Sequence, residues 1–208
     1  MKDQNQIWNQ AHLNHQVNHS KGGASSFAKE IESLIPKNSK VIEFGCGNGV
    51  DAAYFAECGH NVLATDFSES AIDADKKKFG SVNNLSFQVF NLENSFNFDN
   101  DFDLVYARLS LHYFVDQKTK EIFGEISNIL SPSGIIAFIC KSTKDPLYGK
   151  GREIEKDMYE ADHIRHFFSK DYALECLGDR FRVEKVEEGE ENFYNSPSAY
   201  VKVIARRS

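Results

Sequence analysis

Short apolar runs and helix-spaced apolar positions alternate along most of this chain. Runs typical of buried strands occur at about 40–44, 61–65, 85–90, 104–107 and 135–140. Apolar residues recur at helical spacing at about 49–58, 68–79 and 116–130. Such alternation is typical of an α/β domain whose mostly parallel sheet is covered by helices on both faces. The pattern therefore predicts one α/β domain.

The amino end differs from this pattern. Residues 1–24 are polar, and we expect them to form a lid segment before a domain that covers 25–208. Ser25 or Ser26 is expected to cap a first helix, which Pro36 ends. Histidines of the lid share one face if the segment is helical, a spacing that would also suit a transition metal. We favour the polar lid and predict no metal. These histidines are His12, His15 and His19.

The carboxyl third also interrupts the alternation. Residues 141–168 carry many charges and two glycines and predict an irregular connecting loop. After this loop, the pattern predicts a helix at about 169–177 and strands near 181–187 and 199–206.

Composition narrows the class of protein. The 208 residues fit one domain, and the 41% hydrophobic and 26% charged fractions are ordinary for a soluble globular protein. There is no bilayer-length apolar run, and the four cysteines form no C-x-x-C pair, so we expect reduced thiols in the cytoplasm and no membrane partner. A net charge of −7 disfavours nucleic acid as a partner. The sequence leaves the oligomeric state open.

The first strand ends in the chain's most informative motif. Glu43 precedes three alternating glycines, Gly45, Gly47 and Gly49, and Asp66 closes the second strand. In a βαβ unit, such a turn lets a ligand approach the backbone, and the later carboxylate is placed to hold a ribose diol. The spacing is not the G-x-G-x-x-G of dinucleotide sites. A carboxylate before the turn also suits a cationic ligand better than a pyrophosphate.

This motif resembles the acidic-x-Gly-x-Gly-x-Gly motif of the class I S-adenosylmethionine-dependent methyltransferases. The resemblance continues through Asp66, 102–105 and 130–134, and covers roughly 38–142. It implies S-adenosylmethionine as cofactor. It also implies a single Rossmann-like, doubly wound, mostly parallel seven-stranded sheet whose last strand is antiparallel. The compact layout resembles tellurite-resistance-type and related bacterial small-molecule methyltransferases.

The resemblance assigns roles to residues at the strand ends. The glycine turn would wrap the methionine part of the cofactor, and Glu43 would help to organise the turn and the amino group. Asp66 would accept hydrogen bonds from both ribose hydroxyls; a simple helix-capping aspartate is the alternative. Phe67 or Leu92 would lie against the adenine ring. The predicted cofactor-binding set is Glu43, Gly45, Cys46, Gly47, Asn48, Gly49, Asp66, Phe67, Asn91, Leu92, Ala107 and Arg108.

Two members of this set follow later strands. Asn91 stands where the family commonly has an acidic residue, and its amide oxygen can still accept a hydrogen bond from the adenine amino group. Ala107 and Arg108 would pass close to the sulfonium and carboxylate ends of the cofactor. Arg108 either pairs with that carboxylate or is a surface cation.

Methyl transfer from a sulfonium is an in-line displacement, so the enzyme mainly positions donor and acceptor. A base is needed only where the acceptor is protonated, and the candidates are His112, Tyr148 and His166. His112 lies where the family often has a Leu-His pair, although a histidine there is more often structural. The loop at 142–168 lies where related enzymes contact substrate. The cations of 163–166 either hold an acidic acceptor or lie in solvent.

Absent motifs exclude several other classes. The chain lacks both the [Asn/Asp]-Pro-Pro-aromatic loop of base and glutamine amino-methylating enzymes and the Pro-Cys nucleophile of cytosine C5 enzymes. With the acidic net charge, a small-molecule acceptor is favoured. A nicotinamide-dependent oxidoreductase is the first alternative, but no Tyr-x-x-x-Lys motif is present. A non-catalytic sensor or scaffold that binds S-adenosylmethionine is the second alternative.

Overall fold

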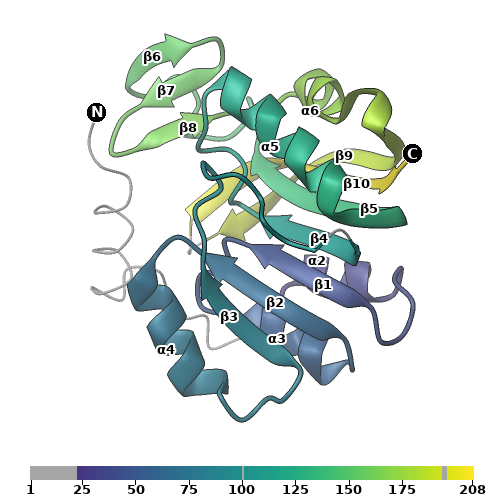
Figure 1. The fold of residues 1–208 in the computed structure, drawn as a ribbon. Helices are drawn as coiled ribbons and strands as arrows, with labels where there is room; N and C mark the ends of the chain where they lie inside the picture. Colours follow the sequence, from purple (N-terminus) through teal and green to yellow (C-terminus); the bar gives the residue numbers. More distant parts are fainter. Residues whose placement is uncertain (1–22, 100, 194–195) are drawn as a thin grey trace.

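The computed structural model describes residues 23–99, 101–193 and 196–208 (Figure 1). In these ranges, seven strands form one sheet in the order β3-β2-β1-β4-β5-β10-β9. The strands are β1 Lys40–Phe44, β2 Asn61–Asp66, β3 Leu85–Val89, β4 Phe102–Arg108, β5 Leu130–Lys141, β9 Phe181–Phe193 and β10 Ser196–Arg207. Neighbours from β3 to β5 pair in parallel, whereas β10 is antiparallel to both β5 and β9. The predicted mostly parallel sheet with an antiparallel last strand is confirmed.

Helices lie on both faces of this sheet. They are α2 Ser26–Glu32, α3 Val50–Glu57, α4 Glu69–Phe79, α5 Asp116–Ile129 and α6 Lys170–Leu177, followed by the 3-10 turn η1 Gly178–Arg180. Serine side chains cap three of them: the hydroxyls of Ser25, Ser68 and Ser169 accept backbone N–H groups in the first turns of α2, α4 and α6. None of the helices in the described ranges has the length and hydropathy to cross a bilayer.

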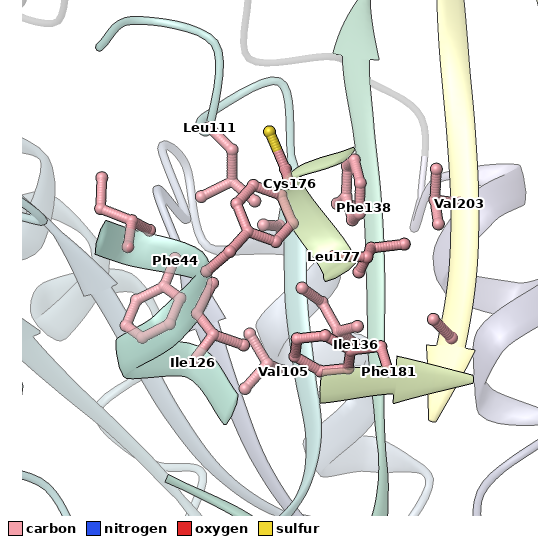
Figure 2. Close-up of a cluster of buried hydrophobic side chains, with 14 of the residues drawn as sticks. Phe44, Val105, Leu111, Ile126, Ile136, Phe138, Cys176, Leu177, Phe181 and Val203 are labelled. Carbon is pink, nitrogen blue, oxygen red and sulfur yellow. The ribbon is translucent and has the colours of Figure 1, made fainter. Parts of the chain in front are cut away.

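The alternation of side chains along the strands produces two apolar cores. Ile42 and Phe44 of β1 point to one face, where they join buried residues of α5 and α6 (Figure 2). Val41 of the same strand points to the other face, where α2, α3 and α4 cover it. Because the central strands β1, β4 and β5 are buried on both faces, their carboxyl ends are the place where polar side chains can gather.

The stretch 141–168 is not the irregular loop that the sequence predicts. It forms a second, antiparallel sheet in the order β6-β7-β8, with β6 Arg152–Glu155, β7 Met158–Glu160 and β8 Ile164–His166. Strands of three or four residues are too short to produce a recognisable period, and their pairing partners set them. The strands β9 and β10 are likewise longer than predicted, because each pairs with the other along almost its whole length.

Candidate functional site

The turn after β1 has a backbone that glycine adopts without strain. Gly45, Gly47 and Gly49 have φ of +73°, +58° and +65°, in the left-handed region. The N–H of Gly45 donates to the carbonyl oxygen of Thr65 at 2.8 Å, which ties the turn to β2. A Cβ added at Gly47 would meet no atom within 4 Å, whereas one at Gly45 would overlap the side chain of Ser110. The turn therefore packs against the chain at Gly45 and is open at Gly47.

Asp66, at the end of β2, joins this turn to the next helix. Its Oδ2 accepts the N–H of Gly47 at 3.0 Å, and its Oδ1 accepts the N–H of Ser68 at 2.9 Å. The residue that caps α4 is Ser68, so Asp66 is not the helix cap of the alternative interpretation. A carboxylate has about four lone-pair positions, which leaves Asp66 able to accept further hydrogen bonds beside Gly47.

Four carboxyl groups surround the turn. Glu43 is buried, and its Oε2 has no hydrogen-bond partner among the described residues. Burial raises the pKa of Glu43 well above its ordinary value, and the charges of Asp51, Asp75 and Asp66 raise it further. Burial likewise raises the pKa of Asp75 to about 7, and the thiol of Cys46 lies 3.9 Å from its Oδ2. This concentration of acidic groups fits a cationic ligand.

Asp51 fixes the start of α3. Its Oδ1 accepts the N–H of Ser25 at 2.7 Å, while its Oδ2 accepts the hydroxyls of Ser25 at 2.7 Å and Tyr106 at 2.8 Å. These bonds join α2, α3 and β4 directly behind the glycine turn. The role of Asp51 was not predicted, although an acidic residue in the first helical turn after the glycines is a signal that would have found it.

Residues predicted to contact adenine lie in different surroundings. Leu92 is buried in the core next to Phe96, whereas Phe67 is only half-buried. The amide oxygen of Asn91 accepts the N–H of Glu93 at 2.9 Å in a local turn. Phe67 is therefore better exposed for contact with a planar ring than Leu92.

The end of β4 brings three residues near the turn. Ala107 is fully buried in the core. The guanidinium of Arg108 lies 5.0 Å from the centre of the Phe193 ring and forms no ion pair with another described residue. Its positive charge lowers the pKa of Glu43, against the larger effect of burial. Ser110 was not predicted: its hydroxyl donates to the carbonyl oxygen of Phe44 at 2.6 Å, beneath Gly45.

His112 follows β4 and is completely buried. Neither ring nitrogen has a hydrogen-bond partner among the described residues. Burial, together with the positive charges of Lys141 and Arg165, holds the pKa of His112 well below its ordinary value. The ring is therefore neutral at physiological pH. It lies against Tyr113, with 4.3 Å between ring centres.

The other two predicted catalytic residues belong to the region of the small sheet. The backbone N–H of His166 donates to the carbonyl oxygen of His112 at 2.9 Å, which brings β8 to the loop after β4. The ring of His166 packs on Tyr172 of α6, at 4.3 Å between centres. The hydroxyl of Tyr148 donates to Asp157 at 2.6 Å, so the structure does not bring Tyr148 into contact with either histidine.

The predicted lid falls mostly outside the described residues, as do His12, His15 and His19. Within the ranges that the structure describes, no group of three or more His, Cys, Asp or Glu side chains is placed to hold a metal ion.

Known proteins similar to this chain share the segment that builds the glycine turn. A family described as a methyltransferase domain matches residues 41–134. The chain is 30% identical to the putative methyltransferase YqeM of Bacillus subtilis over 122 residues, which are 56% of this chain and 48% of that protein. It is 26% identical to malonyl-[acyl-carrier protein] O-methyltransferase 2 of Ilyobacter polytropus over 152 residues, 71% of this chain and 56% of that protein. It thus spans about half the length of these relatives.

Solved structures share the fold. A methyltransferase from Methanosarcina mazei superposes with a TM-score of 0.75 at 19% identity, over 86% of this chain and 96% of that chain. Residues 41–134 therefore match a methyltransferase-domain family, and the described fold is that of S-adenosylmethionine-dependent methyltransferases of known structure. A TehB-like methyltransferase from Corynebacterium glutamicum, with a TM-score of 0.69 at 18% identity, covers 98% of both chains. The family predicted from the motif is confirmed.

The glycine turn fits S-adenosylmethionine, the cofactor that the methyltransferase-domain match implies. S-adenosylmethionine carries a sulfonium and an ammonium, and the turn offers four carboxyl groups together with an unpartnered oxygen of Glu43. The open position at Gly47 leaves room for a ligand against the backbone. Asp75 was not predicted as a site residue. Its only signal in the sequence is the spacing of Ala71, Ile72 and Asp75, which places the three on one inward face of α4.

Proposed function

We propose that this protein transfers the methyl group of S-adenosylmethionine to a small-molecule acceptor by in-line displacement. The observation that carries the proposal is the buried, unpartnered carboxyl of Glu43 among Asp51, Asp66 and Asp75, beside a glycine turn that is open at Gly47. When bound, the cofactor supplies an activated methyl group on a cationic sulfur. The surrounding carboxylates favour that cation, and the turn fixes its direction.

The residues at the strand ends then take separate roles. Asp66 accepts hydrogen bonds from the ribose hydroxyls while its bond to Gly47 holds the turn in place. Phe67 packs on the adenine ring. The amide of Asn91, which follows β3, faces the edge of that ring. Arg108 acts at the carboxylate end of the cofactor.

His112 is the group best suited to contact the acceptor. A neutral imidazole has one donor and one acceptor nitrogen, and both nitrogens of His112 lack a protein partner in the described ranges. A neutral ring can accept a hydrogen bond from a hydroxyl or ammonium group of the methyl acceptor and so orient it. His166 positions this loop through its backbone bond to His112. Tyr148 steadies the small sheet through Asp157.

The surroundings of the site support a small acceptor in the cytoplasm. All four cysteines are free, as expected for a reducing compartment. The net charge of −7 opposes a nucleic-acid acceptor. The malonyl-[acyl-carrier protein] O-methyltransferase relative acts on a malonyl group carried by a protein, so a carrier-bound acceptor is the finer alternative within the same chemistry.

Thermal unfolding with added ligands tests the donor assignment. We expect S-adenosylmethionine and S-adenosylhomocysteine to stabilise the protein by about 2.7 kcal/mol at roughly a hundredfold above their dissociation constants. Asp66→Asn should reduce the shift, while Asp73→Asn, an exposed carboxylate of α4, serves as the matched control. Stabilisation by NAD or NADP, with no response to either S-adenosyl compound, would refute the proposal in favour of an oxidoreductase.

Label transfer separates an enzyme from a sensor. The protein is incubated with S-adenosylmethionine labelled in its methyl group and a bacterial metabolite extract, and the label is followed into small molecules. An enzyme labels at least one metabolite, and His112→Asn lowers the rate with little change in donor binding. Donor binding without any labelled product in extracts would identify a non-catalytic sensor or scaffold.

A further inference from the structure

The small sheet β6-β7-β8 covers the chain that follows β4, on the side where an acceptor would enter. Besides the bond from His166 to His112, the N–H of Phe168 donates to the carbonyl oxygen of Lys141 at 2.8 Å. The N–H of Asp116, at the start of α5, donates to Glu155 of β6 at 2.8 Å. Figure 1 shows the small sheet as a separate layer near the amino-terminal end of α5. These bonds fix its position relative to the proposed site.

A cavity of about 130 Å³ lies on one face of this sheet. Its polar lining comes from Lys150, Tyr159, Asp162 and Arg165, and its volume suits a small charged group. Tyr159 and Arg165 are paired across β7 and β8, so their side chains point to the same face. The cavity is therefore built from the sheet itself.

Arg165 has an unused donor. Its Nη1 and Nη2 donate to the two oxygens of Asp162 at 2.9 Å and 3.5 Å, but its Nε is buried and has no partner among the described residues. The side chain of Arg165 is 13% exposed, whereas that of Asp162 is 67% exposed. A guanidinium has donors only, so its unused N–H requires an oxygen acceptor. An ion pair with so exposed a carboxylate is weak, and it leaves Arg165 available to a ligand.

The charges around the cavity also favour an anion. Lys150 is exposed and forms no ion pair with another described residue. Lys141, by contrast, is paired with Asp145 at 2.8 Å and does not line the cavity. The glycine turn collects carboxylates, whereas the lining of this cavity carries the two cations Arg165 and Lys150 against the one carboxylate of Asp162. Donor and acceptor sides thus differ in the sign of their charge.

A row of packed rings leads from His112 to the start of the strand that carries Arg165. Tyr113 lies 4.3 Å from the ring centre of His112 and 5.5 Å from that of His163. His163 directly precedes β8, and Arg165 lies within that strand, two residues further along the chain. An acceptor with its reacting atom near His112 can therefore extend a second group toward Arg165.

We propose that this cavity binds an anionic group of the methyl acceptor, a carboxylate or a phosphate, and that Arg165 is the residue that selects for it. The guanidinium of Arg165, which lines the cavity, donates to the oxyanion, and Lys150 adds a second positive charge at the cavity's rim. This inference rests on the proposed function, because it names the chemical class of the acceptor at the same site.

Fractionated extracts test the acceptor class. A metabolite extract is separated on a strong anion exchanger into retained and unretained fractions, and label transfer is measured with each. We expect activity with the retained fraction only. Arg165→Gln should lower it roughly 10- to 100-fold, as expected for the loss of a hydrogen bond to a charged group. Arg152→Gln is the matched control, because Arg152 lies on the same sheet, is exposed, and pairs with Glu160 outside the cavity.

A binding measurement needs no knowledge of the acceptor. With S-adenosylhomocysteine present and ionic strength held constant, inorganic phosphate or acetate should raise the melting temperature of wild type and of Arg152→Gln, but not of Arg165→Gln. The anion that acts more strongly distinguishes phosphate from carboxylate acceptors. Lys150→Gln changes an exposed side chain without risk to the fold, and should give a smaller loss in both assays.

The two proposals fail in different ways. If S-adenosylhomocysteine stabilises wild type and Arg165→Gln equally, but the unretained fraction supports methyl transfer, the anionic acceptor is wrong and the donor assignment stands. Equal activity of Arg165→Gln and Arg152→Gln has the same meaning. If S-adenosylhomocysteine stabilises none of the proteins, the proposed function fails and the acceptor inference fails with it.

Discussion

Alanine substitutions at Gly45 and Gly47 separate packing of the glycine turn from binding by it. Both residues have positive φ, so alanine costs roughly 1–2 kcal/mol of backbone strain at either position. At Gly45 the new Cβ would also overlap Cβ of Ser110 and lie 3.2 Å from its Oγ. Overpacking of this kind adds roughly 1–3 kcal/mol. Gly45→Ala should therefore destabilise the fold by about 1–3 kcal/mol more than Gly47→Ala.

For cofactor binding we expect the opposite order: relative to its effect on stability, Gly47→Ala should weaken binding more than Gly45→Ala does. A Cβ at Gly47 points into open space that the proposed cofactor would fill, so Gly47→Ala should weaken S-adenosylhomocysteine binding while most of the fold's stability remains. Gly59→Ala is the matched control. Gly59 has φ of +94° and equally open space, but it lies between α3 and β2 at the far end of the strands. It should show the strain without the loss of affinity.

Urea unfolding followed by circular dichroism gives the stability differences, and calorimetric titration gives the affinity. The double variant of Gly45→Ala with Ser110→Gly should recover part of the loss, because the overlapping atoms are removed; the coupling energy measures the overlap. Equal destabilisation at Gly45 and Gly47, with no coupling to Ser110, would refute the packing argument. Equal affinity of the Gly47 and Gly59 variants would show that the open face is not the ligand's.

Three further substitutions test the buried polar groups. The pKa of Asp75 is raised by burial from 3.8 to about 7, so the folded state retains a proton that the unfolded state has released. Stability should then fall as pH rises from about 4 to about 7, by up to roughly 1.4 kcal/mol per pH unit, and Asp75→Asn should flatten this part of the urea-midpoint profile; an unchanged slope would contradict the assignment. Tyr106→Phe removes the 2.8 Å hydrogen bond to Asp51 and should lower the free energy of unfolding in urea by about 1.5–3 kcal/mol. An unchanged free energy of unfolding would mean that this bond is absent in solution. Lys141→Met leaves the buried carboxylate of Asp145 without its cation and should cost about 3–5 kcal/mol at pH 7, measured the same way; a loss below about 1 kcal/mol would mean that water replaces the lysine.

Local chemistry explains why most of the large sheet was predictable. The glycines of the turn require positive φ, serines cap α2, α4 and α6, and apolar runs mark strands that are buried on both faces. Each of these signals depends on a few neighbouring residues. The order of the strands was not predicted, and the antiparallel β10 was predicted from the family resemblance alone.

Non-local packing explains what the sequence did not predict. The strands β6, β7 and β8 are three or four residues long, and their positions depend on each other and on the loop that carries His112. Leu92 was expected near the adenine ring, yet it fills the core because the turn that follows β3 directs it inward. Asp75 sits inside the site because α4 packs against the glycine turn, as the short distance between Asp75 and Gly49 indicates.

The separation of charge connects these features into one site. Carboxylates behind the glycine turn attract a sulfonium more strongly than the neutral thioether that remains after transfer, so they favour the substrate form of the cofactor over its product. Placed on the same side, an anionic acceptor would be repelled by Asp66 and by the other ionised carboxyl groups around the turn. The small sheet removes this conflict by supplying Arg165 on a separate element, beyond the row of rings that begins at His112. A chain with an acidic net charge can therefore bind a cation and an anion side by side, because the two are recognised by different layers of the fold.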